Sequence, residues 1–370
     1  MHLRLLLMLS AFSSSLFAQT FTLYVGTYTG SGSKGIYAYR FNALIGKATF
    51  LNARDSVTNP SFLAISPNKK FLFAVNETDG KNPGKVNSYA INPTTGKLTF
   101  LNQQETGGDN PCYVAVHKSN NWLAVANYSG GSASVLKINA NGSLQPYAQL
   151  MQDSGKGTNP ARQEKAHVHS TVFSPDNAFL FTPDLGLDKV MAYRFNQFSA
   201  RPLTKASPSM VTTEDGSGPR HLTFHPNNRF AYLIEEMAGV VSAYKYNNGR
   251  LILIQRIATH PSTYKGNPGS ADIHVSPDGK FLYASNRGDE NNISIFKIDP
   301  RTGRLQAKGY QSVLGKTPRN FVIDPTGNYL LAANQGTNNV VIFKRNKTTG
   351  ALTATGNELQ IPMPVCLKWL

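Results

Sequence analysis

Cysteine and tryptophan are scarce in this 370-residue sequence, with two of each. Cys112 and Cys366 are too few and too far apart to define a disulfide framework. They occupy equivalent places in the repeat described below, so we expect two buried free thiols. Neither tryptophan is followed by aspartate, which excludes a repeat of the WD type.

Acidic residues are also few: the sequence has 21 Asp and Glu and 37 Lys and Arg, which gives a formal net charge of +16. Such a surface suits acidic small molecules, polysaccharides or a membrane surface. The basic residues form no cluster, no basic helix and no nucleic-acid-binding motif. We therefore expect a solvated basic surface and no nucleic-acid partner.

Long hydrophobic runs are missing as well, and no segment is long enough for a membrane-spanning helix. The mostly apolar stretch at residues 5–12 follows Arg4 and leads into small and polar residues up to Ala18. This order is typical of a signal peptide, and no cysteine follows that would carry a lipid anchor. We predict that residues 1–18 are a signal peptide and that the mature protein is periplasmic or secreted.

The sequence does contain a repeat. Seven eight-residue segments share one alternating apolar pattern and begin at residues 59, 110, 167, 218, 269, 317 and 363, so their spacing is 46 to 57 residues. The first six are followed by a polar turn and by three further segments with strand-like alternation. No helical pattern of any length accompanies them. Four strands per repeat at this period predict the blades of a β-propeller.

The two ends of the chain complete the ring. Residues 21–29, 35–42 and 46–52 match the second, third and fourth strands of the repeat, and residues 363–370 match the first. Joined, these strands make a seventh blade and remove the open edge of an unclosed sheet. We therefore predict an all-β, seven-bladed propeller with four-stranded antiparallel blades, a single domain spanning residues 19–370.

The first strand of each blade lines the central channel of a propeller, so equivalent residues form a ring. The third positions of the seven segments carry Ser61, Cys112, His169, Arg220, Ala271, Arg319 and Val365. In the six complete blades, a second ring lies fifteen residues further on, at Asn76, Asn127, Asp184, Glu235, Asn286 and Asn334. The residues that follow these are Glu77, Tyr128, Leu185, Glu236, Arg287 and Gln335. A largely polar insertion at 147–166 is a candidate rim of the channel.

Charged residues at these ring positions are costly to bury unless they are paired or used. Most blades carry small or neutral residues at the third position, which is what we expect where the residue has no catalytic or binding role. We therefore predict four catalytic residues, namely His169, Arg220, Glu236 and Arg287.

Six further residues are expected to bind substrate in the same sector: His167, Asp184, His221, Asp272, His274 and Arg319. Opposite charges crowded there would shift one another's pKa values and keep a carboxylate ionised. Alternatively, Asp184, Asp272 and His274 hydrogen-bond strand ends and turns, and His221 is structural. His167 and His169 could bind a metal with Asp184, but no other clear ligand accompanies them, so we expect no metal.

Five motifs stand out along the chain: YVGTYT at residue 24, HVHS at 167, GPRH at 218, NRG at 286 and TPRNFVID at 317. This combination, spread over nearly all of the predicted mature chain, resembles the propeller lactonase family. That family includes bacterial 6-phosphogluconolactonases of propeller type and fungal carboxymuconate cyclases. Its proposed active residues, a His, two Arg and a Glu, fall on His169 or His167, Arg220, Glu236 and Arg287. The resemblance implies hydrolysis or formation of a lactone ring without a required metal or organic cofactor.

On this resemblance we expect hydrolysis of a sugar lactone, either 6-phosphogluconolactone or a non-phosphorylated aldonolactone. Arg220 and Arg287 would bind an anionic group or polarise the carbonyl, while Glu236 or a histidine activates water. Export favours the non-phosphorylated substrate, and the basic charge favours the phosphorylated one. Two alternatives stay open: a lactonising cycloisomerase that acts on a muconate, and a non-catalytic propeller that binds a glycan or a protein. The expected partner is a small-molecule lactone or sugar acid, and no oligomeric state is predicted.

Overall fold

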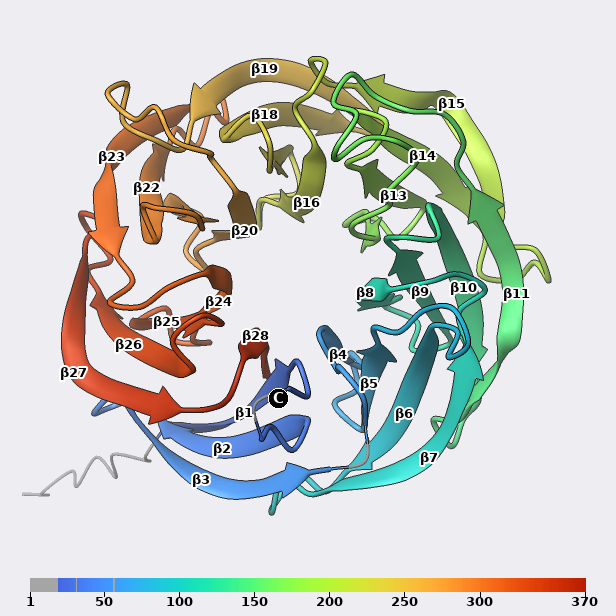
Figure 1. The fold of residues 1–370 in the computed structure, drawn as a ribbon, viewed down its shortest axis with the longest axis horizontal. Coiled ribbons are helices and arrows are strands. Elements are labelled where there is room, and N and C mark those ends of the chain that lie inside the picture. The colour runs from blue at the N-terminus through green and yellow to red at the C-terminus, as the bar shows by residue number, and fades with distance from the viewer. Residues whose placement is uncertain (1–18, 31, 56) are drawn as a thin grey trace, which may run out of the picture.

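The computed structural model describes residues 19–370 except 31 and 56, and these residues form a ring of seven four-stranded antiparallel sheets (Figure 1). The described residues contain no helix, and so none that could cross a membrane. The predicted signal peptide, residues 1–18, lies outside the described residues. The predicted all-β, seven-bladed fold is confirmed.

Six blades follow one another along the chain, with the first strand of each nearest the centre of the ring (Figure 1). Blade 1 contains β4 (Leu63–Ile65), β5 (Phe71–Asn76), β6 (Lys85–Ile91) and β7 (Leu98–Glu105). Blade 2 contains β8 (Pro111–Val116), β9 (Trp122–Asn127), β10 (Ser132–Ile138) and β11 (Leu144–Gln152). Blade 3 contains β12 (Val172–Phe173), β13 (Phe179–Asp184), β14 (Lys189–Phe195) and β15 (Leu203–Thr212).

The remaining blades have the same order. Blade 4 contains β16 (Pro219–Phe224), β17 (Phe230–Glu235), β18 (Val240–Asn247) and β19 (Arg250–Ala258). Blade 5 contains β20 (Ser270–Val275), β21 (Phe281–Asn286), β22 (Asn292–Ile298) and β23 (Leu305–Ser312). Blade 6 contains β24 (Pro318–Ile323), β25 (Tyr329–Asn334), β26 (Asn339–Arg345) and β27 (Leu352–Gln360). The closing blade combines β28 (Pro364–Trp369) with β1 (Thr20–Thr27), β2 (Ile36–Asn42) and β3 (Lys47–Arg54).

Neighbouring blades pack through the apolar side chains that alternate along their strands. Between blades 5 and 6, for example, Phe281 and Tyr283 are buried against Phe321. Burial of each such side chain contributes roughly 1.5–3 kcal/mol. Gly350 reaches over Phe281 at φ +80°, and a Cβ there would lie 2.4 Å from the ring, so this close approach requires glycine. The turn of one blade thereby closes over the aromatic core of the blade before it.

The ends of the chain close the ring as predicted. β28 pairs antiparallel with β1, with Leu23 opposite Trp369 and Val25 opposite Leu367. The Trp369 ring packs on Phe41 at a centroid distance of 5.2 Å, and its Nε1 donates to the carbonyl oxygen of Ile323 at 2.9 Å. The ring contact lies within the closing blade, and the hydrogen bond joins that blade to blade 6. Cys112 and Cys366 are both buried free thiols, which confirms that prediction.

Blade 3 differs from the predicted pattern in two ways. The expected first strand at 167–174 is reduced to β12, with an isolated bridge between Val168 and Asp184. The predicted insertion at 147–166 is shorter, because residues 147–152 continue β11 and pair with β10. The loop proper therefore begins at Asp153. It enters the channel region next to the interrupted strand, which lets it place a side chain at the channel mouth.

Candidate active site

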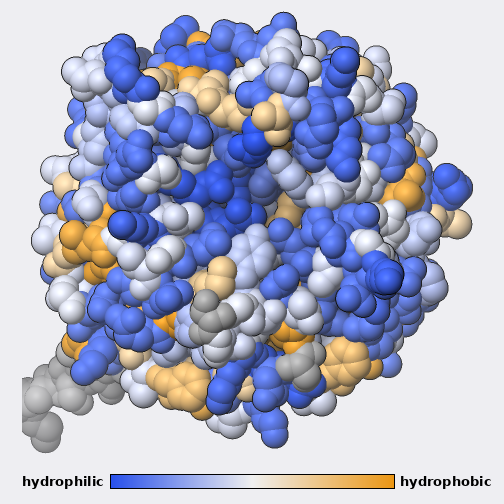
Figure 2. Space-filling model, viewed as in Figure 1, coloured by the Kyte–Doolittle hydropathy of each residue, from blue (hydrophilic) through white to orange (hydrophobic). Residues whose placement is uncertain are grey.

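The predicted ring of channel residues is present. Six of the seven third-position residues line one small cavity at the channel centre, together with Phe62, His221 and Asn320; the six are Ser61, Cys112, His169, Arg220, Arg319 and Val365. Each comes from a different blade, so the repeat brings residues far apart in sequence to one place. Hydrophilic side chains gather around the hollow at the centre of the ring (Figure 2).

Glu236 is the centre of a buried charged cluster. Its Oε2 accepts from Arg220 Nε at 2.9 Å and lies 2.8 Å from Arg287 Nη2, while its Oε1 accepts from Arg162 Nη2 at 2.7 Å. Only 6% of the Glu236 side chain is exposed. Arg220 is in β16 of blade 4, Arg287 directly follows β21 of blade 5, and Arg162 is in the 153–166 loop. The cluster therefore depends on the assembled ring.

The electrostatics of this cluster keep the carboxylate charged. Burial alone would raise the pKa of Glu236, but the positive charges of Arg287, Arg220 and Arg162 outweigh it and hold the pKa well below its usual value. Burial and the nearby Arg287 and Arg319 lower the pKa of Arg220 to about 10. Both groups are thus ionised near neutral pH, and one carboxylate fixes the orientation of three guanidinium groups.

Arg162 is a functional candidate that the sequence pattern did not reveal. It lies in an insertion without a counterpart in other blades, so no ring position marks it. Asn159 holds the turn before it, because its Oδ1 accepts the backbone N–H of Ala161 at 3.0 Å. Gln163 Nε2 donates to the carbonyl oxygen of Leu185 at 2.8 Å and ties the loop to blade 3. The only available signal was the polar insertion beside the channel.

A chain of hydrogen bonds runs from Arg220 to His274. Arg220 Nη1 lies 3.2 Å from His221 Nε2, and His221 Nδ1 lies 2.8 Å from Asp272 Oδ1. Asp272 Oδ2 lies 2.9 Å from His274 Nε2 and also accepts from the amide of Asn320. Burial and the charge of Arg220 lower the pKa of His221 to about 3, so this imidazole is neutral and accepts from Arg220.

Asp272 anchors that chain as a carboxylate. Burial alone would raise its pKa, but His274 and the hydrogen bond from His221 outweigh it and hold the pKa well below its usual value. Since both oxygens of Asp272 are occupied by protein groups, the geometry favours an orienting role for Asp272 and His221 over direct substrate contact.

His169 lies beside this chain with its ring edge-on to that of His221, at a centroid distance of 5.3 Å. Its Nδ1 lies 3.8 Å from Cys112 Sγ. Burial and the charge of Arg220 hold the pKa of His169 well below its usual value, so it is neutral at neutral pH. Among the described residues, its Nε2 has no hydrogen-bond partner. In the tautomer that carries the proton on Nδ1, this nitrogen is available as a base.

His167 and Asp184 are engaged elsewhere. Asp184 is buried, and its Oδ1 accepts backbone N–H groups of His167, Gly186 and Leu187 at 2.8, 2.9 and 3.1 Å. The His167 ring stacks on Tyr128 at 4.5 Å. In the described part of the chain, no group of three or more His, Cys, Asp or Glu is arranged to hold a metal ion. The geometry thus favours the alternative that Asp184 stabilises a turn.

Arg319 completes the charged wall. Its guanidinium carbon lies 5.5 Å from the centre of the Tyr28 ring, and the Tyr28 hydroxyl donates to Glu77 at 3.0 Å. No carboxylate among the described residues forms an ion pair with Arg319. The prediction that Arg319 binds substrate is therefore compatible with its open guanidinium.

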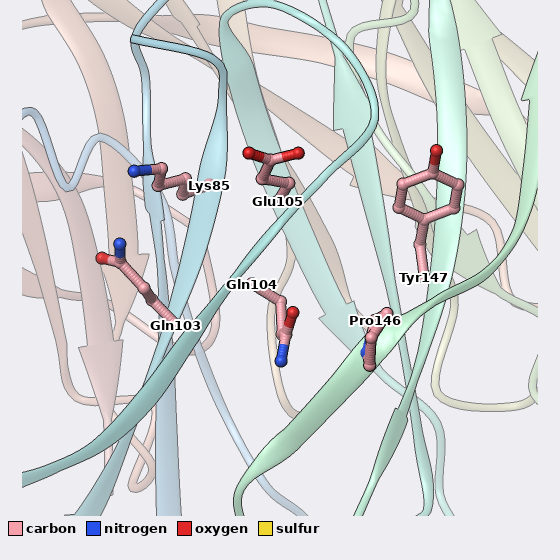
Figure 3. Close-up of a pocket in the computed structure, with 6 residues that line it drawn as sticks. All are labelled: Lys85, Gln103, Gln104, Glu105, Pro146 and Tyr147. Carbon is pink, nitrogen blue, oxygen red and sulfur yellow. The ribbon is translucent and has the colours of Figure 1, made fainter.

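A cavity of about 320 Å³ lies at the channel mouth beside the Glu236 cluster, which is in the size range of small-ligand sites. It is lined by Arg162, Glu236, Met237, Asn267, Gly269, Arg287, Gly288 and Thr317. A hollow of about 330 Å³ lies between β7 and β11, lined by Lys85, Gln103, Gln104, Glu105, Pro146 and Tyr147 (Figure 3). That hollow is on the outer strands and contains no buried charged cluster. The mouth cavity is therefore the candidate active site.

The comparisons with known proteins agree with this fold. The family model described as Lactonase, 7-bladed beta-propeller matches residues 22–369. The chain is 39% identical over 341 residues to the 6-phosphogluconolactonase of Formosa agariphila, covering 92% of this chain and 96% of that protein. It is 36% identical over 349 residues to the 6-phosphogluconolactonase of Bacillus subtilis, covering 94% and 97%.

A solved structure of similar sequence has the same fold. The periplasmic gluconolactonase PpgL of Pseudomonas aeruginosa superposes with a TM-score of 0.90 at 38% identity, over 95% of this chain and 99% of that one. The family model spans all seven blades of the ring, including the closing blade. The chain belongs to the seven-bladed β-propeller lactonase family.

Proposed function

We propose that this protein hydrolyses a sugar lactone in the cavity at the channel mouth. The observation that carries the proposal is the Glu236 cluster, in which one buried carboxylate aligns the guanidinium groups of Arg162, Arg220 and Arg287 beside a ligand-sized cavity. Relatives that are 36% and 39% identical over most of their length are named 6-phosphogluconolactonase. A purely binding propeller would not need these groups together.

The arginines supply positive charge where a lactone carbonyl develops negative charge. Preoriented donors of this kind stabilise the tetrahedral intermediate because they need no rearrangement during the reaction. Arg287 and Arg162 line the cavity and are the candidates for contact with the carbonyl oxygen or with an acidic substituent. Arg220 is buried beneath them and holds Glu236 in place.

His169 is a better candidate for the general base than Glu236. Three guanidinium groups stabilise the ionised form of Glu236, so this carboxylate has little tendency to accept a proton. His169 is neutral and its Nε2 is open. In the proposed reaction, a water oxygen adds to the carbonyl carbon while Nε2 accepts the water proton. The bond from carbon to the ring oxygen then breaks, and the ring oxygen leaves as a hydroxyl with that proton.

The test is hydrolysis of glucono-1,5-lactone and of its 6-phosphate by the purified protein, followed as proton release above the spontaneous rate. We expect acceleration of at least one lactone, lost in Arg220→Ala and retained in Arg250→Ala, an exposed arginine of β19. No acceleration of either lactone, with the protein folded, would refute the proposal. Activity on a muconate without activity on either lactone would instead identify a cycloisomerase.

We further propose that residues 1–18 direct export and that the substrate is a non-phosphorylated aldonolactone. The support is the signal-like pattern of these residues, and a relative is named a periplasmic gluconolactonase. Cell fractionation with the native N-terminus tests the location. A higher kcat/KM for the 6-phosphate than for the unphosphorylated lactone would contradict the substrate proposal.

A further inference from the structure

The small cavity at the channel centre adjoins the mouth cavity. Arg220 lines the small cavity, and Glu236, which accepts from Arg220 Nε, lines the mouth cavity, so the two cavities meet at this ion pair. Two rings that line the small cavity, Phe62 and His221, pack on Tyr113. Phe62 stacks on Tyr113 at a centroid distance of 4.0 Å, and Tyr113 meets His221 edge-on at 5.2 Å. The cavity has room for about one water molecule.

Three polar groups that line this cavity lack a partner among the described residues. Ser61 Oγ is buried and makes no hydrogen bond. Arg319 makes no hydrogen bond or ion pair, and only its cation–π contact with Tyr28 is present. His169 Nε2 is also open. Ser61 Oγ is the buried one of these groups, and buried polar groups are almost always hydrogen-bonded. Its unpaired hydroxyl, beside the unpaired Arg319 guanidinium and His169 Nε2 in the same cavity lining, indicates a ligand that the described part of the chain does not supply.

The chemistry of the three groups defines that ligand. Arg319 only donates hydrogen bonds, so the ligand must accept. His169 is neutral, and in the tautomer that carries the proton on Nδ1 its open Nε2 accepts, so the ligand must also be able to donate. Ser61 does either. A halide could accept from Arg319 and Ser61 but could not donate to His169. A molecule that both donates and accepts and is of this size is water.

We infer that this cavity binds the water molecule that attacks the lactone, and that Ser61 and Arg319 position it against His169. This inference rests on the proposed lactone hydrolysis, in which His169 takes the water proton. Ser61 has no charge and no unusual sequence context, so the ring pattern alone gave it no role. The structure makes it a positioning residue, since it holds the nucleophile and does not itself react.

The kinetic test compares Ser61→Ala with Ser88→Ala. Ser88 is also buried, but its Oγ donates to Gly142 far from the channel, so its substitution controls for loss of a buried hydroxyl. We expect Ser61→Ala to lower kcat roughly tenfold with KM little changed, because substrate binding at the mouth is untouched. Ser88→Ala should keep wild-type kinetics. Equal kcat values for the two variants would overturn the inference.

A second measurement responds to the water site and not to general stability. Ser61→Gly enlarges the cavity, so methanol should compete better with water as the nucleophile. The expected result is a larger fraction of methyl ester product in methanol–water mixtures than for wild type, after subtraction of the spontaneous reaction. An unchanged ester fraction in Ser61→Gly would contradict a water site next to Ser61.

Diffraction distinguishes this inference from the proposed function. Crystals of the wild-type protein should show one water within hydrogen-bond distance of Ser61 Oγ, Arg319 and His169 Nε2. A bromide soak should give no anomalous peak there, and such a peak would replace the water site with a halide site. If this water is present and the protein hydrolyses no lactone, the proposed function fails while the water site stands. If lactones are hydrolysed and no water binds there, the inference alone fails.

Discussion

Two groups of buried carboxylates, in neighbouring parts of the ring, have opposite surroundings. Glu236 is held by three guanidinium groups, which lower its pKa despite its burial. Asp153 and Asp184 are buried together with no arginine, and their side chains hydrogen-bond each other, which requires a proton on one of the two carboxyl groups. Burial and the charge of Asp153 raise the pKa of Asp184 to about 7, and burial raises that of Asp153. Neighbouring charges, more than depth, decide which form of a buried acid is stable.

The repeat explains why the Asp153–Asp184 pair is unusual. In blade 2, the equivalent residue Asn127 donates its amide to the carbonyl oxygen of Thr106, and in blade 5 Asn286 donates to Thr259. A carboxylate at this position has no proton to donate. Asp184 can fill the same role only in its protonated form, which fits its raised pKa.

Removing the charge of Glu236 should have the largest effect. Glu236→Gln leaves three guanidinium groups without their carboxylate, so their alignment at the cavity is lost. We expect lactonase activity to fall roughly 10²–10³-fold, as for loss of an oxyanion-stabilising group. Proton-release assays on the folded variant measure this. Glu105→Gln, in the hollow of Figure 3, should keep full activity, and equal activities of the two variants would contradict the site assignment.

Changing Asp272 tests a third environment of a buried carboxylate, one in which two imidazoles are hydrogen-bond partners. Asp272→Asn would replace one carboxylate oxygen with an amide donor, so this residue could no longer pair with His221 on one side and with His274 and Asn320 on the other. The His221 ring that accepts from Arg220 would then be less well ordered. We expect kcat/KM to fall roughly 30-fold, about 2 kcal/mol of transition-state stabilisation. Asp215→Asn, at an exposed position, is the matched control. A wild-type kcat/KM in Asp272→Asn would show that the His221 chain does not orient Arg220.

Weakening the cluster by one charge should have a smaller effect. Arg162→Ala removes the half-exposed member, whose side chain is 43% accessible, and leaves Arg220 and Arg287 on Glu236. We expect a decrease in kcat/KM of roughly tenfold, because one of the two arginines that line the mouth cavity is lost. Lys165→Ala in the same loop serves as the control. A wild-type kcat/KM in Arg162→Ala would argue against a role of Arg162 in the site.

The Asp153–Asp184 pair should affect stability more than activity. The folded pKa of Asp184 lies above its unfolded value, so this group's contribution is fully present below about pH 4 and is lost as pH rises through about 7. Asp153→Asn supplies an amide donor to the Asp184 carboxylate. The free energy of unfolding of this variant at pH 8 should rise by about 1 kcal/mol relative to wild type.

Thermal or urea unfolding at pH 5 and pH 8 measures this difference. Asp79→Asn, which replaces an exposed aspartate, should follow the wild-type pH dependence. If Asp153→Asn and the wild-type protein lose stability equally between the two pH values, the carboxyl pair is not the source of the pH dependence.

The sequence predicts those features of the structure that the repeat determines. Alternating apolar positions and polar turns determine strands and blade number, so the ring position of Arg220, Arg319 and Ser61 follows from counting. Two features of the site could not be predicted from the repeat. Arg162 reaches Glu236 from a loop without repeat counterparts, and Asp184 turns to backbone N–H groups where the first strand of blade 3 is interrupted. Both depend on local hydrogen bonds that spacing does not encode.

The closing blade has a consequence for the order of folding. β1 pairs with β28, so the channel-facing edge of residues 20–27 stays uncovered until residues 364–369 have been made and have paired with it. Contacts between such distant segments form slowly, because the loop entropy must be overcome before the contact stabilises anything. Until then, β1 presents an unpaired strand edge that can bind another chain. The newly made protein therefore depends on its last few residues for protection against aggregation.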